Sequence, residues 1–190
     1  MSGIFREAYL LFRDPVHIKD VYLHTSVSEA LDQAQIRAEI KLNGKEQITA
    51  RLLNPCGGTV AEKTVPLEDG GDLAFDLTDP VLWNAECPKN YELLLFCGEE
   101  ILHFFVGLKR LEIKNSVVFL NGKKIKLLGV NRHDSHPLLG HATPYAHMLN
   151  DLFILKRHNC NAIRTSHYPN DPRLPGLCDL LGFYLIDETD

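Results

Sequence analysis

Apolar and polar residues alternate along much of the first half of the chain. In residues 34–42 every second side chain is apolar, and the side chains between them are Gln35, Arg37, Glu39 and Lys41. Successive side chains of a β-strand point to opposite faces, so this stretch predicts a strand with one buried face and one exposed face. Asn43-Gly44 follows. We expect a turn there, because both residues tolerate positive φ.

Weaker alternation recurs in short runs that turn-forming residues separate. The runs are residues 48–52, 73–77, 91–95 and 101–105. The separators include Asn54-Pro55, Gly57-Gly58, Asp69-Gly70-Gly71 and Asp79-Pro80. No long helical pattern interrupts them. Short strands at this spacing predict an antiparallel β-sandwich of the immunoglobulin type, which we assign to residues 16–110.

The pattern changes from about Leu111. Two apolar runs, residues 117–120 and 125–128, flank Asn121-Gly122, which is a strong hairpin signal. Apolar residues at helical spacing follow. We expect this helix to begin with Thr143 as the N-cap and Pro144 at the first helical position, and to end after a basic last turn.

Residues 161–165 then predict a buried strand. Asp171-Pro172 predicts the start of a second helix, which Gly182 ends, and residues 183–186 predict a third strand. The order β-α-β-α-β predicts a parallel sheet with helices outside it. The fold class expected for the whole chain is therefore mixed, with an antiparallel sandwich followed by a parallel α/β segment.

Polar clusters follow each of the three predicted parallel strands. They are Asn131-Arg132-His133-Asp134, Ser166-His167-Tyr168 and Asp187-Glu188. The carboxyl ends of parallel strands share one edge, where the working groups of such folds gather. Imidazoles and amides can each donate or accept hydrogen bonds, and Tyr168 can stack on an apolar sugar face. The clusters therefore predict a site for a neutral, hydroxyl-rich ligand.

Composition narrows the classes of partner. The chain has 190 residues, 45% of them hydrophobic, and a formal net charge of -5, which argues against nucleic acid as a partner. No apolar stretch is long enough to span a bilayer, and the N-terminus lacks the order of a signal peptide. Five cysteines without a CxxC pair suit reduced thiols in a cytosolic protein. We expect a cytoplasmic protein with neither a membrane nor a nucleic-acid partner.

Two other chemistries deserve weighing at the polar clusters. His133, Asp134 and His136 could be zinc ligands, but their spacing matches no common zinc signature. Ser166 and His167 with Asp171 could suggest a nucleophile triad, but the G-x-S-x-G turn is missing. A catalytic pair of Asp187 and Glu188 is disfavoured, because neighbours on an extended strand point to opposite faces.

Three segments of the last third of the chain carry long motifs. They read Gly-Val-Asn-Arg-His-Asp-x-His-Pro at 129–137, Asn-Ala-Ile-Arg-Thr-Ser-His-Tyr-Pro-Asn at 161–170 and Leu-Cys-Asp-Leu-Leu-Gly-Phe-Tyr-Leu-Ile-Asp-Glu at 177–188. Together they closely resemble the opening of the catalytic barrel in glycoside hydrolase family 2. Arg132 with His136-Pro137 looks like the β-galactosidase branch, because the β-glucuronidase branch usually has lysine at the Arg132 position and lacks the His-Pro pair.

The resemblance extends toward the N-terminus. Ser2-Gly3-Ile4-Phe5-Arg6 resembles the end of the family's N-terminal jelly-roll domain. Asp79-Pro80 through Trp83, then Pro88 and Tyr91, resembles the late part of its immunoglobulin-like domain. The resemblance implies a tail of the jelly-roll domain at 1–15, an immunoglobulin-like sandwich at 16–110 and the first part of a (β/α)8 barrel at 111–190.

The resemblance implies a fragment of a retaining β-galactosidase that hydrolyses terminal β-D-galactose residues. The family's two catalytic glutamates lie on later barrel strands, beyond Asp190, so we expect the chain alone to be inactive. His133 and His167 would contact the galactosyl hydroxyls. Arg164 would lie beneath the site and brace it. The rim would be shaped by Asn131, Arg132 and Asp134. The remaining supporting residues, Asp187 and Glu188, would be structural carboxylates.

The same resemblance implies Mg²⁺ and Na⁺ in the parent enzyme but no metal ligand set in this chain. Asp190 stands where many relatives have asparagine. The expected partner is a β-galactoside. Three strands cannot close an eight-stranded barrel, so we also expect oligomers or self-association through the incomplete barrel. The alternative is a non-enzymatic β-sandwich spacer or docking module, which has no need of polar clusters at three strand ends.

Overall fold

The structure is a computed structural model that describes residues 4–189. Expectations that concern Ser2, Gly3 and Asp190 lie outside these residues. The chain divides into two compact units. The sandwich unit consists of Leu11–Asn84 and Lys89–Ile125, and the parallel unit of Met1–Leu10, Ala85–Pro88 and Lys126–Asp190. The domain boundaries expected at residues 15 and 110 stay a prediction.

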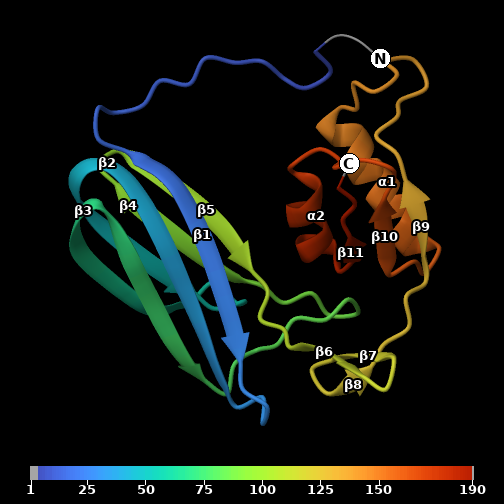
Figure 1. Ribbon diagram of the computed structural model, residues 1–190, viewed down its shortest axis with the longest axis horizontal. Helices are drawn as coiled ribbons and strands as arrows, with labels where there is room; N and C mark the ends of the chain where they lie inside the picture. Colours follow the sequence, from blue (N-terminus) through green and yellow to red (C-terminus); the bar gives the residue numbers. More distant parts are fainter. Residues whose placement is uncertain (1–3, 190) are drawn as a thin grey trace. The chain divides into compact units, whose positions relative to one another are not determined.

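Five antiparallel strands form the main sheet of the sandwich unit (Figure 1). Their bounds are β1 Ile18–Val27, β2 Gln33–Leu53, β3 Thr59–Thr78, β4 Tyr91–Cys97 and β5 Glu100–Val106. The first half of β2 pairs with β1, its second half pairs with β4, and β3 pairs with nearly all of β2. One continuous sheet therefore supplies both halves of the sandwich.

Both halves of β2 contribute to a single hydrophobic core. On either side of residues 43–47 every second side chain of β2 is buried, and these residues are Ala34, Ile36, Ala38, Ile40, Leu42, Ile48, Ala50 and Leu52. Burial of each large aliphatic side chain contributes about 1.5–3 kcal/mol. The alternation thus confirms the predicted antiparallel sandwich.

The predicted turn at Asn43-Gly44 is wrong. β2 runs through these residues, and its pairing with β3 shifts register between Lys41 and Lys45. Opposite the shift, Asp69 and Gly70 have φ of 59° and 140°. A side chain on Gly70 would overlap the carbonyl oxygen of Ile40. The turn-forming residues on the two strands therefore mark a bulge that bends one long hairpin, and they do not separate independent strands.

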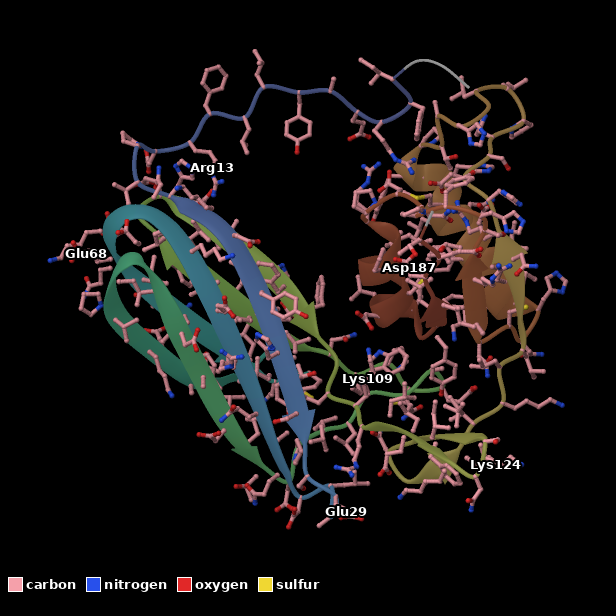
Figure 2. All side chains as sticks on the ribbon, in the orientation of Figure 1. Arg13, Glu29, Glu68, Lys109, Lys124 and Asp187 are labelled. Carbon is pink, nitrogen blue, oxygen red and sulfur yellow. The ribbon has the colours of Figure 1, made fainter. Side chains whose placement is uncertain are left out.

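A small antiparallel sheet completes the sandwich unit. It consists of β6 Leu111–Lys114, β7 Val117–Leu120 and β8 Lys123–Lys124, and Figure 2 labels Lys124 in it. Asn121 and Gly122 have φ of 49° and 73°, which confirms the predicted hairpin turn. The predicted second arm, residues 125–128, is wrong: the arm is β8, and Ile125 makes the last backbone bond to β7 before the chain leaves the ladder.

The parallel unit has the predicted order of elements. Its bounds are β9 Gly129–Arg132, α1 Tyr145–Arg157, β10 Ala162–Thr165, α2 Leu174–Leu181 and β11 Tyr184–Ile186. The three strands are parallel in the order β11-β10-β9. Gly182, with φ of 77°, ends α2 in the left-handed conformation as predicted. The β-α-β-α-β prediction is therefore confirmed.

A second core holds α1 and α2 against the parallel strands. It is made of buried side chains from both helices, from β10 and from the start of the third strand segment: Met148, Leu152, Leu174, Leu177, Cys178, Ile163 and Phe183. Burial raises the pKa of the Cys178 thiol to about 12. Packing against the two helices fixes the parallel strands and so positions the loops that follow them.

The predicted N-cap of α1 is wrong. The helix begins at Tyr145 with Pro144 as its N-cap, and no side chain caps it. Pro144 is extended (ψ 150°), so Thr143 lies one residue too early for its hydroxyl to reach the first free N–H groups. Asp171, expected to start the second helix, caps the turn before it: its Oδ1 accepts from the Arg173 N–H at 2.9 Å.

Candidate functional site

The two faces of the parallel sheet carry different polar groups. Arg164 is paired in register with Asn131 of β9 and Ile186 of β11, so these three residues share one face. Thr165 and Arg132 are paired on the other face, and Arg132 reaches Asp151 of α1. The face of Arg164 is therefore the one turned away from the helices, and we call it the open face.

Arg164 organises the polar groups of the open face. One of its guanidinium nitrogens, Nη1, donates to Asn131 Oδ1 at 3.2 Å, and the other, Nη2, lies 2.5 Å from Glu188 Oε2. The second carboxylate oxygen of Glu188 lies 3.7 Å from His167 Nδ1. These contacts link all three parallel strands at their carboxyl ends.

His133 and His167 meet at the same edge. The centroids of the two rings are 5.5 Å apart, with an interplanar angle of 71°. The Tyr168 ring lies 6.1 Å from that of His133. Both histidines are exposed, and 68% of the His167 side chain is accessible. Two loops that are distant in sequence therefore present imidazole groups at one opening.

The sheet is hollowed on the side of this cluster. A cavity of about 240 Å³ is lined by residues of all three strands, including Gly129, Asn131, Arg164 and Ile186. Gly129 is required here, because a Cβ would overlap the carbonyl oxygen of Ala162 on the neighbouring strand. The close approach of β9 and β10 keeps the polar groups that follow them near one another.

We expected Arg132 at the rim of the site, and this prediction is wrong. Arg132 is 5% exposed and points toward the helices, because successive residues of β9 alternate between faces. Its guanidinium donates to Asp134 at 2.6 Å, to Asp151 at 3.1 Å and to Asn170 at 3.0 Å. Arg132 therefore braces the loops from below, while Asn131 stays exposed on the open face.

Asp134 is also buried and not at the rim. Its side chain is 1% exposed. Besides the Arg132 bond, its Oδ2 accepts from the backbone N–H of Asp171 at 2.8 Å and from Arg6 at 2.7 Å. An ionised carboxylate is stable in such a position because several donors replace its water. Asp134 thus ties the loop after β9 to the loop after β10.

Asp171 lies beside this carboxylate and has its own arginine. Arg173 donates from Nε and Nη2 to the two oxygens of Asp171, both at 2.9 Å, and also pairs with Glu7 at 3.2 Å. The hydrogen bonds from Arg173 lower the pKa of Asp171, against the effect of burial. Burial and the Asp134 carboxylate raise the pKa of Tyr168. The Tyr168 phenol is therefore a donor at neutral pH.

Asp187 and Glu188 point to opposite sides, as predicted. Asp187, labelled in Figure 2, accepts from the Thr165 hydroxyl at 2.8 Å on the helix side of the sheet. Glu188 pairs with Arg164 on the open face. The backbone N–H of Glu188 donates to the same Thr165 oxygen at 2.8 Å. These two carboxylates therefore do not form a catalytic pair.

The alternatives of a metal centre and a nucleophile triad find no support in the described part of the chain. Residues 4–189 contain no group of three His, Cys, Asp or Glu side chains arranged to hold a metal ion. His136 Nδ1 accepts from the N–H groups of Leu138 and Leu139 within its own turn. The Ser166 hydroxyl is buried without a hydrogen-bond partner, so it is not activated by His167.

Several residues of this network were missed from the sequence. Arg6, Asp151, Asn170 and His141 all contact Arg132 or Asp134. Strand parity was the available signal: if Asn131 and His133 face outward, Arg132 and Asp134 face the helices and need partners there.

No described helix is long and apolar enough to cross a membrane.

Comparison with known proteins gives matches along nearly the whole chain. A family model described as "Glycosyl hydrolases family 2" matches residues 16–101, and one described as "Glycosyl hydrolases family 2, TIM barrel domain" matches residues 111–190. The chain belongs to glycosyl hydrolase family 2. The parallel unit of this family 2 chain thus contains the beginning of a TIM barrel, after an immunoglobulin-like sandwich.

Curated relatives of the family 2 chain are much longer. A protein named beta-galactosidase from Actinobacillus pleuropneumoniae is 42% identical over 191 residues, which is 100% of this chain and 18% of that protein. A beta-galactosidase from Staphylococcus xylosus is 36% identical over 190 residues, with 100% and 19% covered. The chain therefore spans about a fifth of the length of these relatives.

Among solved structures, the family 2 chain is similar to the beta-glucuronidase of Parabacteroides merdae. The TM-score is 0.81 at 25% identity, over 90% of this chain and 23% of that one. The agreement supports the observed fold, with a β-sandwich and the first strands and helices of a barrel.

Proposed function

We propose that this chain supplies part of the galactosyl-binding pocket of a retaining β-galactosidase that hydrolyses terminal β-D-galactose residues. The observation that carries the proposal is the meeting of His133 and His167, with ring centroids 5.5 Å apart. His167 lies beside Glu188, which pairs with Arg164 at the carboxyl edge of the parallel sheet. In barrel enzymes this edge carries the active site.

The two imidazoles suit a sugar. Each neutral imidazole has one donor and one acceptor nitrogen, so it can bond a hydroxyl in either sense. Their exposure leaves these nitrogens available to a ligand. Hydrogen bonds to sugar hydroxyls that strengthen as the oxocarbenium-like transition state forms would raise turnover more than ground-state binding.

Arg164 would act beneath the sugar and not on it. Its guanidinium orients the Asn131 amide and compensates the charge of Glu188, so the Arg164–Glu188 pair adds little net charge to the open face. A neutral galactosyl ring fits such a face. A uronic acid would need a cation for its carboxylate, and the guanidinium groups of Arg164 and Arg132 are already engaged by carboxylates. The names of the curated relatives point to the same substrate class.

The chain by itself should not hydrolyse galactosides. Retaining hydrolysis needs two carboxyl groups about 5–5.5 Å apart on either side of the scissile bond. Glu188 is engaged by Arg164, and Asp187 is on the other face with Thr165. Neither carboxylate is placed as an acid/base or nucleophile with a partner. The use of Mg²⁺ and Na⁺ by the complete enzyme stays a prediction, and no step proposed here depends on either ion.

The test compares a complete enzyme that contains this sequence with the 190-residue chain alone. Both are assayed with p-nitrophenyl β-galactoside and p-nitrophenyl β-glucuronide, and the anomeric product is followed by NMR. We expect the complete enzyme to cleave the galactoside with retention and the chain to show no turnover above background. Preference for the glucuronide would overturn the substrate assignment. Turnover by the chain alone would show that its carboxylates are catalytic after all.

A further inference from the structure

Arg6 reaches the candidate site from the N-terminal segment of the parallel unit. Its Nη2 lies 2.7 Å from Asp134 Oδ2, and its Nη1 lies 3.9 Å from Asp171 Oδ2. The Arg6 side chain is 29% exposed, whereas the Asp134 and Asp171 side chains are 1% and 3% exposed. A partly buried guanidinium therefore caps two buried carboxylates.

These two carboxylates belong to the loops that carry the histidines. Asp134 directly follows His133, and its side chain binds the backbone N–H of Asp171 in the loop after β10. The backbone oxygen of Asp134 accepts from the Tyr168 hydroxyl at 3.3 Å, and Tyr168 directly follows His167. Any movement of Asp134 is therefore passed to both histidine loops.

A second contact fixes the same backbone oxygen. His141 Nδ1 lies 2.9 Å from the Asp134 oxygen and 3.1 Å from the Tyr168 hydroxyl. The Phe5 ring lies 6.2 Å from that of His141, and the Arg6 guanidinium lies 5.0 Å from the Phe5 ring centroid. Phe5 and Arg6 thus reach His141 and Asp134 from one short segment.

Charge explains why Arg6 is needed besides Arg132 and Arg173. Arg132 serves Oδ1 of Asp134 and Arg173 serves both oxygens of Asp171. Arg6 adds a third guanidinium beside Oδ2 of Asp134 and Oδ2 of Asp171. Without it, two neighbouring buried carboxylates would lack a counter-charge on that side, and like charges in such a setting repel strongly.

We propose that Arg6 is a positioning residue, which holds His133 and His167 at their mutual distance by locking Asp134 and Asp171 together. Its effect on the histidine rings stands on the geometry alone, whereas its effect on turnover rests on the proposed function. Arg6 touches neither histidine ring and acts through the loops that carry them.

The first experiment observes the rings in the 190-residue chain. Selective NMR of the histidine side chains should show a nuclear Overhauser effect between His133 and His167. We expect Arg6→Gln to abolish this effect and shift both ring signals, and Arg6→Lys to retain it, since an ammonium can still pair with Asp134. Arg13→Gln is the matched control, because Arg13 is an N-terminal arginine paired with Glu100 in the sandwich unit. Unchanged ring signals in Arg6→Gln would overturn the proposal, and so would loss of the fold in both Arg6 variants.

The second experiment measures the complete enzyme. We expect Arg6→Gln to lower kcat about 10- to 100-fold while KM changes less than about threefold, because small misplacements of aligned groups act on the transition state. Arg6→Lys should recover most of the loss. An equal loss in both variants would contradict positioning by charge and geometry. If the rings are disturbed in the chain but the wild-type enzyme cleaves no β-galactoside, the proposed function fails and the positioning role stands.

Discussion

The imidazole ring of His133 stands at 71° to that of His167, with the two centroids 5.5 Å apart. Neither ring is covered by the core, and the loops that carry them are joined beneath the surface by Asp134. Exposed groups on a buried, hydrogen-bonded support are typical of a preorganised binding site. The arrangement separates residues that touch a ligand from those that maintain the loops.

Replacement of either exposed histidine should affect activity and spare stability. In the complete enzyme, His133→Ala or His167→Ala should lower kcat about 100-fold, which is the size expected for loss of one transition-state hydrogen bond. The melting temperature should change little, because surface side chains away from the core contribute within about 0.5 kcal/mol.

The control for this pair is His158→Ala, an exposed histidine at the end of α1. Calorimetry and kinetic assays on the three variants give both readings. If both site variants lose several degrees of stability while His158→Ala does not, His133 and His167 are structural residues.

Two glycine-to-alanine changes in the parallel unit should act in opposite directions. Gly129→Ala should destabilise the unit by about 3 kcal/mol, because its methyl group would overlap the Ala162 carbonyl oxygen between β9 and β10. Gly176→Ala, in helix α2 with open space around it, should stabilise by about 0.5–1 kcal/mol. Urea unfolding followed by circular dichroism at 222 nm measures both, since α1 and α2 lie in this unit. Equal effects of the two changes would show that β9 and β10 can separate.

Acid should weaken the parallel unit through Asp171. Its pKa is lowered in the folded state by Arg173, so the unfolded chain takes up the proton first as pH falls. The stability that Asp171 contributes is full above its unfolded pKa of about 3.9 and is lost as pH falls through the lower folded value. Asp171→Asn should therefore be less stable at neutral pH and show a shallower decline below about pH 4.

Circular dichroism at 222 nm reports this decline for the parallel unit. Glu100→Gln is the control, because hydrogen bonds from Arg13 lower the pKa of Glu100 in the sandwich unit, whose unfolding Trp83 fluorescence follows. An identical acid profile for Asp171→Asn and wild type would exclude Asp171 as a source of the pH dependence.

Apolar residues of the parallel unit should cause self-association of the isolated chain. Side chains on and near the edge strands β9 and β11 are 41–49% exposed, namely Leu127, Leu128, Val130 and Ile186. Exposed apolar strand edges recruit partners. We expect sedimentation to show concentration-dependent oligomers that Ile186→Lys weakens, whereas Val81→Lys, which lies outside any strand of the sandwich unit and is 45% exposed, has little effect. A wild-type monomer whose residues 126–189 resist protease would contradict the expectation.

The sequence predicted the elements well where the apolar periodicity and the residues that end helices and strands agreed. The parallel strands were found because short apolar runs end in polar clusters and because Gly182 ends α2. It failed where turn-forming residues had another use: Asn43-Gly44 and Gly70 absorb a bulge within a paired hairpin, which only the pairing partner reveals. Thr143 failed as a cap because Pro144 took the N-cap position.

For the candidate site, the sequence grouped loops that do meet at one edge of the sheet, but it did not separate the exposed residues of those loops from the buried ones. Arg132 and Asp134 were expected at the rim and are buried, since their partners Asp151 and Arg6 come from a helix and from the N-terminal segment. Neither partner lies near them in the sequence, so local motifs carry no sign of the contact. Strand alternation indicates only that partners are needed, and the folded chain identifies them.

The bent β2–β3 hairpin has a consequence for how the sandwich opens. β2 pairs with β1 in its first half and with β4 in its second half, and β3 pairs with both halves. The two halves of the sandwich therefore share the backbone hydrogen bonds between β2 and β3. Local opening of one half would therefore weaken the β2–β3 hydrogen bonds of the other half. Amide hydrogens of the two halves should then exchange with deuterium as one cooperative foldon, and the sandwich should tear as a single sheet under load.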